Sequence, residues 1–139
     1  MLGGLAACSR GHHEPIAMST EMHAQLTSFT DERCEVRYAD TQRPLEQCVS
    51  RDGRIRAWLI LDAGGLRGIS YELNLTAAEA RATLRRAVQG FIDEGLLEAL
   101  CVDLDAGTPV SDWREGRDVR GSVQILPGMR RVDIRWVYL

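Results

Sequence analysis

Five carboxylates gather around one polar stretch of the chain, residues 106–118. They are Asp103, Asp105, Asp112, Glu115 and Asp118. Oxygen ligands of this kind bind Ca²⁺, and a pair of carboxylates can supply general acid and base catalysis. The spacing matches no EF-hand, and three arginines interleave with the acids. A solvated loop held by salt bridges is the simplest interpretation. A calcium site, and a hydrolase that uses Asp103 and Glu115, are the alternatives.

Other catalytic sets have little support in the sequence. The three histidines His12, His13 and His23 all lie near the N-terminus. A Ser-His-Asp or Cys-His arrangement would have to take its base from that segment. No C-x-x-C spacing occurs, so we predict no zinc site. We therefore expect a protein that is not an enzyme and uses no cofactor.

Trp113 is the residue of the polar stretch that most suggests binding. No apolar neighbour in sequence covers its ring. Tryptophan and arginine are enriched where protein interfaces gain most of their energy, and loops on a rigid scaffold often bind partners. Two interpretations stand. The ring folds back over the sheet, or Asp112, Trp113, Arg114 and Glu115 form a partner-binding surface.

Three cysteines lie in the body of the chain: Cys34, Cys48 and Cys101. Three pairings are possible, but residues 40–44, Asp-Thr-Gln-Arg-Pro, are typical of a turn that would place Cys34 opposite Cys48. We therefore predict a Cys34–Cys48 disulfide, worth roughly 3 kcal/mol in the chain-entropy model. Cys101 is then a buried apolar residue.

The N-terminal residues Leu5-Ala6-Ala7-Cys8 resemble the lipobox of bacterial lipoproteins. A polar stretch follows at once, which is the usual order of apolar region, cleavage point and tether. The resemblance implies cleavage before Cys8, whose thiol carries a diacylglycerol, and a triacylated anchor. By the family's sorting rule, Ser9 implies the outer membrane. The resemblance thus implies a periplasm-facing, lipid-anchored protein of the bacterial cell envelope.

The signal segment departs from the family in its length and charge. Only seven residues precede Cys8, and no Lys or Arg precedes Arg10. A complete signal peptide has a basic n-region and an apolar region of roughly 7–15 residues. We therefore expect that the chain is written from an internal start or that its true N-terminus lies upstream.

The net charge and the length of the apolar runs argue against a protein that binds nucleic acid or spans a membrane. The 139 residues carry a net charge of −3, which offers no basic surplus for binding nucleic acid. All 17 basic residues are arginine. No run approaches the roughly 20 apolar residues of a membrane-spanning helix. We divide the chain into a signal remnant, residues 1–8, a flexible tether, residues 9–17, and a single domain, residues 18–139.

The first half of the domain predicts a short helix and two hairpins. Ser19 or Thr20 can cap a helix whose apolar face has helical spacing. That face consists of Met18, Met22, Leu26 and Phe29. Alternating residues predict strands at 34–38, 45–49, 54–61 and 69–73, with Trp58 in the core. We interpret the glycine-rich residues 64–68 as a hairpin turn.

The second half predicts a long helix and another hairpin. A capping box at Thr76 opens an amphipathic helix over about 76–95. Residues 100–104 alternate as a strand does, and residues 119–126 and 129–139 form a hairpin around Pro127-Gly128.

The two faces of the last strand are expected to differ. Arg131, Asp133 and Arg135 alternate with Val132, Ile134, Trp136 and Tyr138. The three charged residues are either a second part of the partner surface or a solvated sheet face.

Helix, strands, helix and strands in this order predict an α+β fold, an antiparallel sheet built from hairpins with helices packed on one face. The sequence favours a lipoprotein whose domain binds another envelope protein, as inhibitors, immunity proteins and accessory subunits do. A small-ligand or calcium-binding domain that uses residues 103–118 is the alternative.

Overall fold

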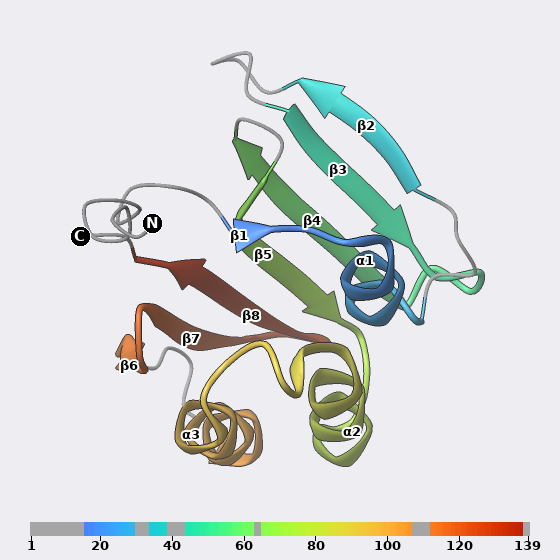
Figure 1. Ribbon diagram of the computed structural model, residues 1–139. Helices are drawn as coiled ribbons and strands as arrows, with labels where there is room; N and C mark the ends of the chain where they lie inside the picture. Colours follow the sequence, from blue (N-terminus) through green and yellow to red (C-terminus); the bar gives the residue numbers. More distant parts are fainter. Residues whose placement is uncertain (1–15, 30–33, 39–43, 63–64, 107–111, 138–139) are drawn as a thin grey trace.

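A computed structural model describes residues 16–29, 34–38, 44–62, 65–106 and 112–137. Within these ranges, one antiparallel sheet packs against three helices that cover one of its faces, as the α+β prediction requires (Figure 1). None of the helices in the described ranges is long and apolar enough to cross a membrane. Cys8 and the proposed tether up to residue 15 lie outside the described residues.

The described strands pair in the order β2-β3-β4-β5-β8-β7-β6, and β1 pairs with β5. The strands are β1 (Ile16–Ala17), β2 (Cys34–Tyr38), β3 (Pro44–Val49), β4 (Ile55–Asp62), β5 (Gly65–Leu73), β6 (Arg114–Glu115), β7 (Val119–Leu126) and β8 (Met129–Trp136). The helices are α1 (Thr20–Leu26), α2 (Ala77–Val88) and α3 (Glu94–Ala106). Each predicted hairpin is therefore present.

The hairpin of β2 and β3 carries the predicted disulfide. Cys34 is the register partner of Cys48, and their sulfur atoms are bonded. Cys101 is a free, buried cysteine in α3, also as predicted. Burial raises the pKa of its thiol, because the low-dielectric interior disfavours the thiolate.

The N-terminal helix α1 packs on the sheet as its apolar spacing predicts. The Ser19 hydroxyl accepts a hydrogen bond from the Met22 backbone N–H, which satisfies one free donor at the helix start. Met22 and Leu26 are buried. The Tyr71 hydroxyl of β5 donates to the Leu26 carbonyl at 3.0 Å, which joins the end of α1 to the sheet.

The region after α2 corrects two predictions. The helix expected over 76–95 ends at Val88, because Gln89 leaves the helical conformation with ψ of 131° and Gly90 follows with φ of 90°, a backbone conformation that favours glycine. The strand expected over 100–104 is part of α3. Leu97, Leu100 and Leu104 are buried at helical spacing, whereas Val102, which completed the alternating pattern, is 62% exposed.

Smaller differences concern four other segments. Residues 65–68, expected in a turn, begin β5. The expected 106–118 loop contains β6, and the last two residues of the expected tether form β1. Trp58 is half-buried on the face opposite the helices, whereas Trp136 is in the core. Tyr138 lies outside the described residues.

Candidate functional site

The face of the sheet that points away from the helices is the candidate site, and we call it the outer face. The strand register defines its residues, because register partners point to the same side of a sheet. They are Glu35, Leu45, Gln47, Val49, Arg56, Trp58, Ile60, Gly68, Ser70, Glu72, Glu115, Arg120, Ser122, Gln124, Leu126, Met129, Arg131, Asp133 and Arg135. The described helices all pack on the opposite side (Figure 1).

Asp133 is the centre of a charged network on the outer face. The Ser70 hydroxyl donates to its carboxylate at 2.5 Å. Arg131 Nε donates to the same carboxylate at 3.2 Å, and Arg135 Nη2 lies 3.5 Å from it. Arg131 also reaches Glu72, with 3.6 Å between Nη1 and Oε2. The charged residues predicted on the last strand therefore hold one another in fixed positions.

Arg135 lies flat across Gly68 of the neighbouring strand. Its Nη1 donates to the carbonyls of Ile134 at 2.9 Å and Ile69 at 3.3 Å. A Cβ atom at position 68 would come within 2.7 Å of Arg135 Cδ, so only glycine leaves room for this side chain. Burial lowers the pKa of Arg135, and the Asp133 carboxylate opposes that change. Arginine stays charged despite such a change.

Trp113 stands at the β6 edge of the outer face and is 42% exposed. The guanidinium carbon of Arg120 lies 4.8 Å from the centre of its ring, a cation–π arrangement. Arg120 is the register partner of both Glu115 and Arg135. The structure thus brings the loop residues Trp113 and Glu115 to the same face as the charged residues of β8.

Arg114 and Asp112 fit the predicted surface less well. Arg114 binds Asp103 of α3 with two hydrogen bonds, from Nε at 2.9 Å and from Nη2 at 2.7 Å. Its side chain therefore joins β6 to the helical side instead of facing outward. Asp112 is exposed beside Trp113 in sequence.

The five acids of the predicted loop do not come together around a cation. Asp103 binds Arg114, and Asp105 Oδ1 accepts from Arg81 at 2.6 Å. Glu115 and Arg114 are neighbours on a strand, so the Glu115 carboxylate points away from Asp103. Among the described residues, the group whose ligand atoms converge closely enough to hold one metal ion contains none of the five acids. Their placement gives the calcium and carboxylate-hydrolase hypotheses no support.

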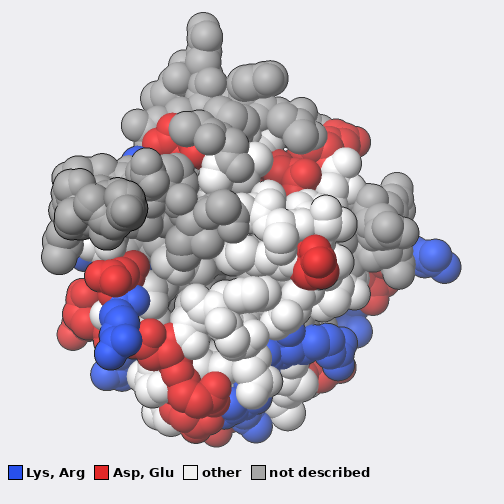
Figure 2. Space-filling model, in the orientation of Figure 1, with Lys and Arg blue, Asp and Glu red and all other residues white. Residues whose placement is uncertain are grey.

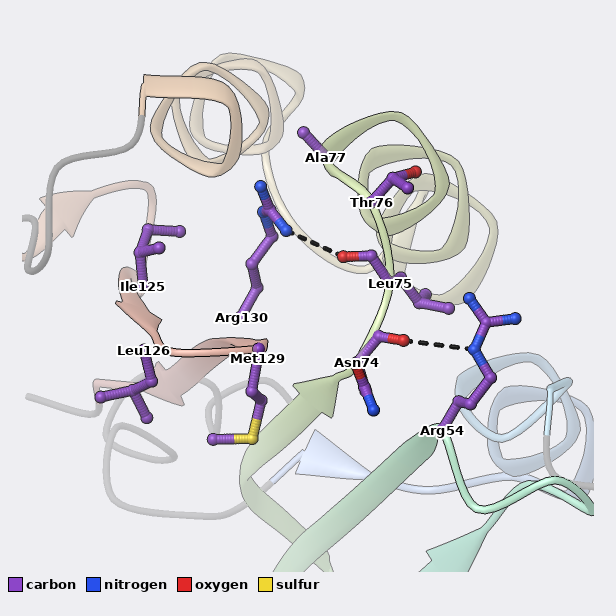
Figure 3. A pocket seen from close by; sticks show the side chains of 10 residues that line it. Arg54, Asn74, Leu75, Thr76, Ala77, Ile125, Leu126, Met129 and Arg130 are labelled. Carbon is purple, nitrogen blue, oxygen red and sulfur yellow. Dashed lines mark hydrogen bonds between the residues drawn. The ribbon is translucent and has the colours of Figure 1, made fainter.

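A pocket of about 660 Å³ opens between the β7–β8 turn and the start of α2 (Figure 3). Its two arginines already bind backbone carbonyls. Arg130 Nη1 donates to Leu75 at 2.8 Å, and Arg54 Nε donates to Asn74 at 3.2 Å. The start of α2 is capped by Thr76 and Glu79. The polar groups that an anion would require therefore have partners, and we assign no ligand to this pocket.

The helical side of the molecule has a different surface. Figure 2 shows acidic and basic side chains side by side over its lower part, where α2 and α3 lie. Ion pairs link the two helices there, between Arg81 and Asp105 and between Arg85 and Glu98. Exposed pairs of this kind contribute little energy each and are typical of a solvated surface.

Comparisons with models of protein families, with curated proteins and with solved structures find no match. Function is therefore inferred from this chain's own residues.

Proposed function

We propose that this protein is a lipid-anchored component of the bacterial cell envelope whose outer face binds another protein. The observation that carries the proposal is the composition of that face. It joins the exposed Trp113 to a group of arginines, and it is covered by none of the described helices. Tryptophan and arginine dominate the energetics of protein interfaces. Membrane attachment through Cys8 rests on the lipobox resemblance alone.

The charged network gives the outer face the order that a binding surface needs. Arg131 and Arg135 are both held against Asp133. Because their side chains are fixed before a partner arrives, little side-chain entropy is lost on binding. Half-buried apolar side chains of β4, Trp58 and Ile60, lie on the same face. The charged network lies between these side chains and Trp113, so the outer face carries apolar groups on both sides of a polar centre.

The side chains of the outer face also indicate which groups the partner's surface should carry. Arg56 and Arg120 are exposed on the outer face. Neither forms an ion pair with a described carboxylate, whereas Arg131 and Arg135 are paired with Asp133. The partner surface is therefore expected to present carboxylates that reach these guanidiniums, with an apolar group against Trp113. An enzyme or toxin that this protein inhibits, or a larger envelope assembly to which it belongs, would supply such a surface.

Site-specific photocrosslinking in cells tests the proposal. A photoreactive residue is placed at Gln124, on the outer face, or at Val102, which is exposed on α3. We expect one discrete protein adduct from position 124 and none from position 102. Trp113→Ala should abolish the adduct from position 124.

The matched control is Val102→Ala, which removes an exposed apolar side chain on the helical side. It should leave the adduct from position 124 unchanged. An adduct from position 102 alone, or one from position 124 that Trp113→Ala does not weaken, would show that the outer face is not the binding surface.

A further inference from the structure

Four side chains with metal-binding atoms converge where α1 packs on β3. They are His23, Cys34, Glu46 and Cys48. One ligand atom from each lies within 4.8 Å of all the others. They come from α1, β2 and β3, so spacing along the chain gave no sign of the cluster. It is separate from the outer face, because Cys48 and Ala57 are register partners that face the core.

Two of the four ligand atoms, His23 Nε2 and Glu46 Oε1, are already in contact. Cys48 Sγ lies 3.8 Å from the same oxygen of Glu46. The Glu46 side chain is 15% exposed and Cys48 is fully buried. His23 remains 31% exposed, which leaves a route for an ion from solvent. Two sulfurs, one imidazole nitrogen and one carboxylate oxygen are a donor set that Zn²⁺ binds tetrahedrally.

We propose that the reduced protein binds one Zn²⁺ through Cys34, Cys48, His23 and Glu46, and that this ion and the disulfide exclude each other. A dithiol passes two electrons and two protons to the Cys34–Cys48 bond and closes its own disulfide. Both protein sulfurs then carry protons. Zn²⁺ displaces these protons to solvent and forms two Zn–S bonds, one bond to His23 Nε2 and one to a Glu46 oxygen.

Binding of Zn²⁺ requires only a local change in the positions of the four ligand atoms. Zinc–ligand bonds of about 2.0–2.3 Å place tetrahedral ligand atoms roughly 3.3–3.8 Å apart. The two sulfurs, bonded in the disulfide, and the contacting atoms of His23 and Glu46 must therefore move apart. Cys48 Sγ and Glu46 Oε1 are already 3.8 Å apart, and no two of the four ligand atoms are more than 4.8 Å apart. Metal binding also replaces the direct contact between His23 and Glu46, which joins α1 to β3, with coordination of both side chains to one ion. The concentration of reducing thiols in the compartment would decide whether the disulfide or the zinc ion stabilises the contact between α1, β2 and β3.

Titration of the purified protein with Zn²⁺ and Co²⁺ tests the proposal. In a phosphine reductant, the Cys101→Ser variant should bind one ion per chain, since its two remaining body cysteines are the proposed ligands. Bound Co²⁺ should show the intense visible bands of a tetrahedral site and a near-ultraviolet thiolate charge-transfer band. Oxidised protein should bind neither ion at the same concentration.

Variants of the other two ligands show whether this cluster holds the ion. His23→Gln should weaken Zn²⁺ binding at least about tenfold, and Glu46→Gln should also weaken it. If His and Glu residues elsewhere held the ion, these two changes would leave the affinity unchanged. Undiminished affinity in His23→Gln, or a Co²⁺ spectrum without thiolate charge transfer, would overturn the proposal.

Circular dichroism covers the case in which loss of the disulfide unfolds the protein. If the reduced, metal-free chain is unfolded, stoichiometric Zn²⁺ must restore its helical signal. Failure of Zn²⁺ to restore the fold would overturn the proposal as firmly as failure to bind. Neither result depends on whether the outer face binds a partner.

Discussion

Asp103 and Arg114 form a two-pronged ion pair that joins α3 to β6, with N–O distances of 2.9 and 2.7 Å. Asp103 is only 8% exposed, so its carboxylate has exchanged water for this arginine. Parallel hydrogen bonds between a guanidinium and a carboxylate fix orientation as well as distance. The pair therefore sets the position of β6, and with it the position of the adjacent Trp113.

Breaking this pair should loosen Trp113 without touching it. Asp103→Asn should speed amide hydrogen exchange at residues 113–115 by about tenfold and weaken crosslinking from position 124. Arg114→Gln should do the same, and the double variant should be no worse than either single variant, because both remove one interaction. Asp105→Asn, on the same helix, is the control and should leave exchange at 113–115 unchanged. If the effects of Asp103→Asn and Arg114→Gln on hydrogen exchange added up in the double variant, the two changes would not be removing one shared interaction.

Two glycine-to-alanine changes should have opposite effects on stability. At Gly68 the new Cβ would lie 2.7 Å from Arg135 Cδ and 2.9 Å from the Ile134 carbonyl oxygen. Gly68→Ala should lower the free energy of unfolding by about 2 kcal/mol. Gly95 of α3 has no atom within 4 Å of its built Cβ, so Gly95→Ala should raise it by about 0.5 kcal/mol. Urea unfolding measures both, and a neutral Gly68→Ala would mean that Arg135 does not lie across the glycine.

The capping box of α2 should make stability depend on pH. The Thr76 backbone N–H, the Thr76 hydroxyl and Arg54 hold the pKa of Glu79 below its usual value of 4.5. Ionised Glu79 therefore stabilises the fold above pH 4.5, and this contribution is lost as the pH falls through the folded-state pKa. Glu79→Gln should lower the melting temperature at neutral pH and change it little in strong acid. An equal decrease at both pH values would argue against a role for the charge.

Lipid attachment can be tested at Cys8. When the native gene is expressed in a bacterial host, growth with a clickable palmitate analogue should label the protein. Cys8→Ser should abolish the label and release the protein from the membrane fraction. Cys101→Ser is the matched control, since a buried cysteine is no substrate for acylation, and it should stay labelled. Persistent labelling of Cys8→Ser would refute the lipoprotein assignment.

Local patterns in the sequence predicted much of the sheet, and they failed where two patterns overlapped. The strands around Cys34 and Cys48 alternate clearly, so both the hairpin and the disulfide could be predicted. Residues 100–104 alternate too, but Leu97, Leu100 and Leu104 also have helical spacing. Packing against β7 decides between them, since Gly121 leaves room for the Leu100 side chain. That contact is not visible in a local window of sequence.

The candidate sites depended on contacts between distant segments even more strongly. The sequence left open whether the charged residues of β8 share a surface with Trp113, and their common face follows from the pairing of β7 with both β6 and β8. The cluster around His23 was missed altogether. Its ligands are brought together by the packing of α1 on β3, and a histidine on a short helix shows no such neighbour in the sequence.

The placement of β1 beside β5 would allow the order of the strands along the chain to be changed by circular permutation. β8 runs along one edge of β5 until Arg135 faces Gly68, and β1 continues along the same edge with Ile16 facing Leu66. Both strands run antiparallel to β5, so they follow one another head to tail. A circular permutant that starts in the exposed turn at Gly128 and passes from β8 straight into β1 would keep every strand neighbour. In that permutant β8 and β1, the last and first strands of the native order, would become a single strand.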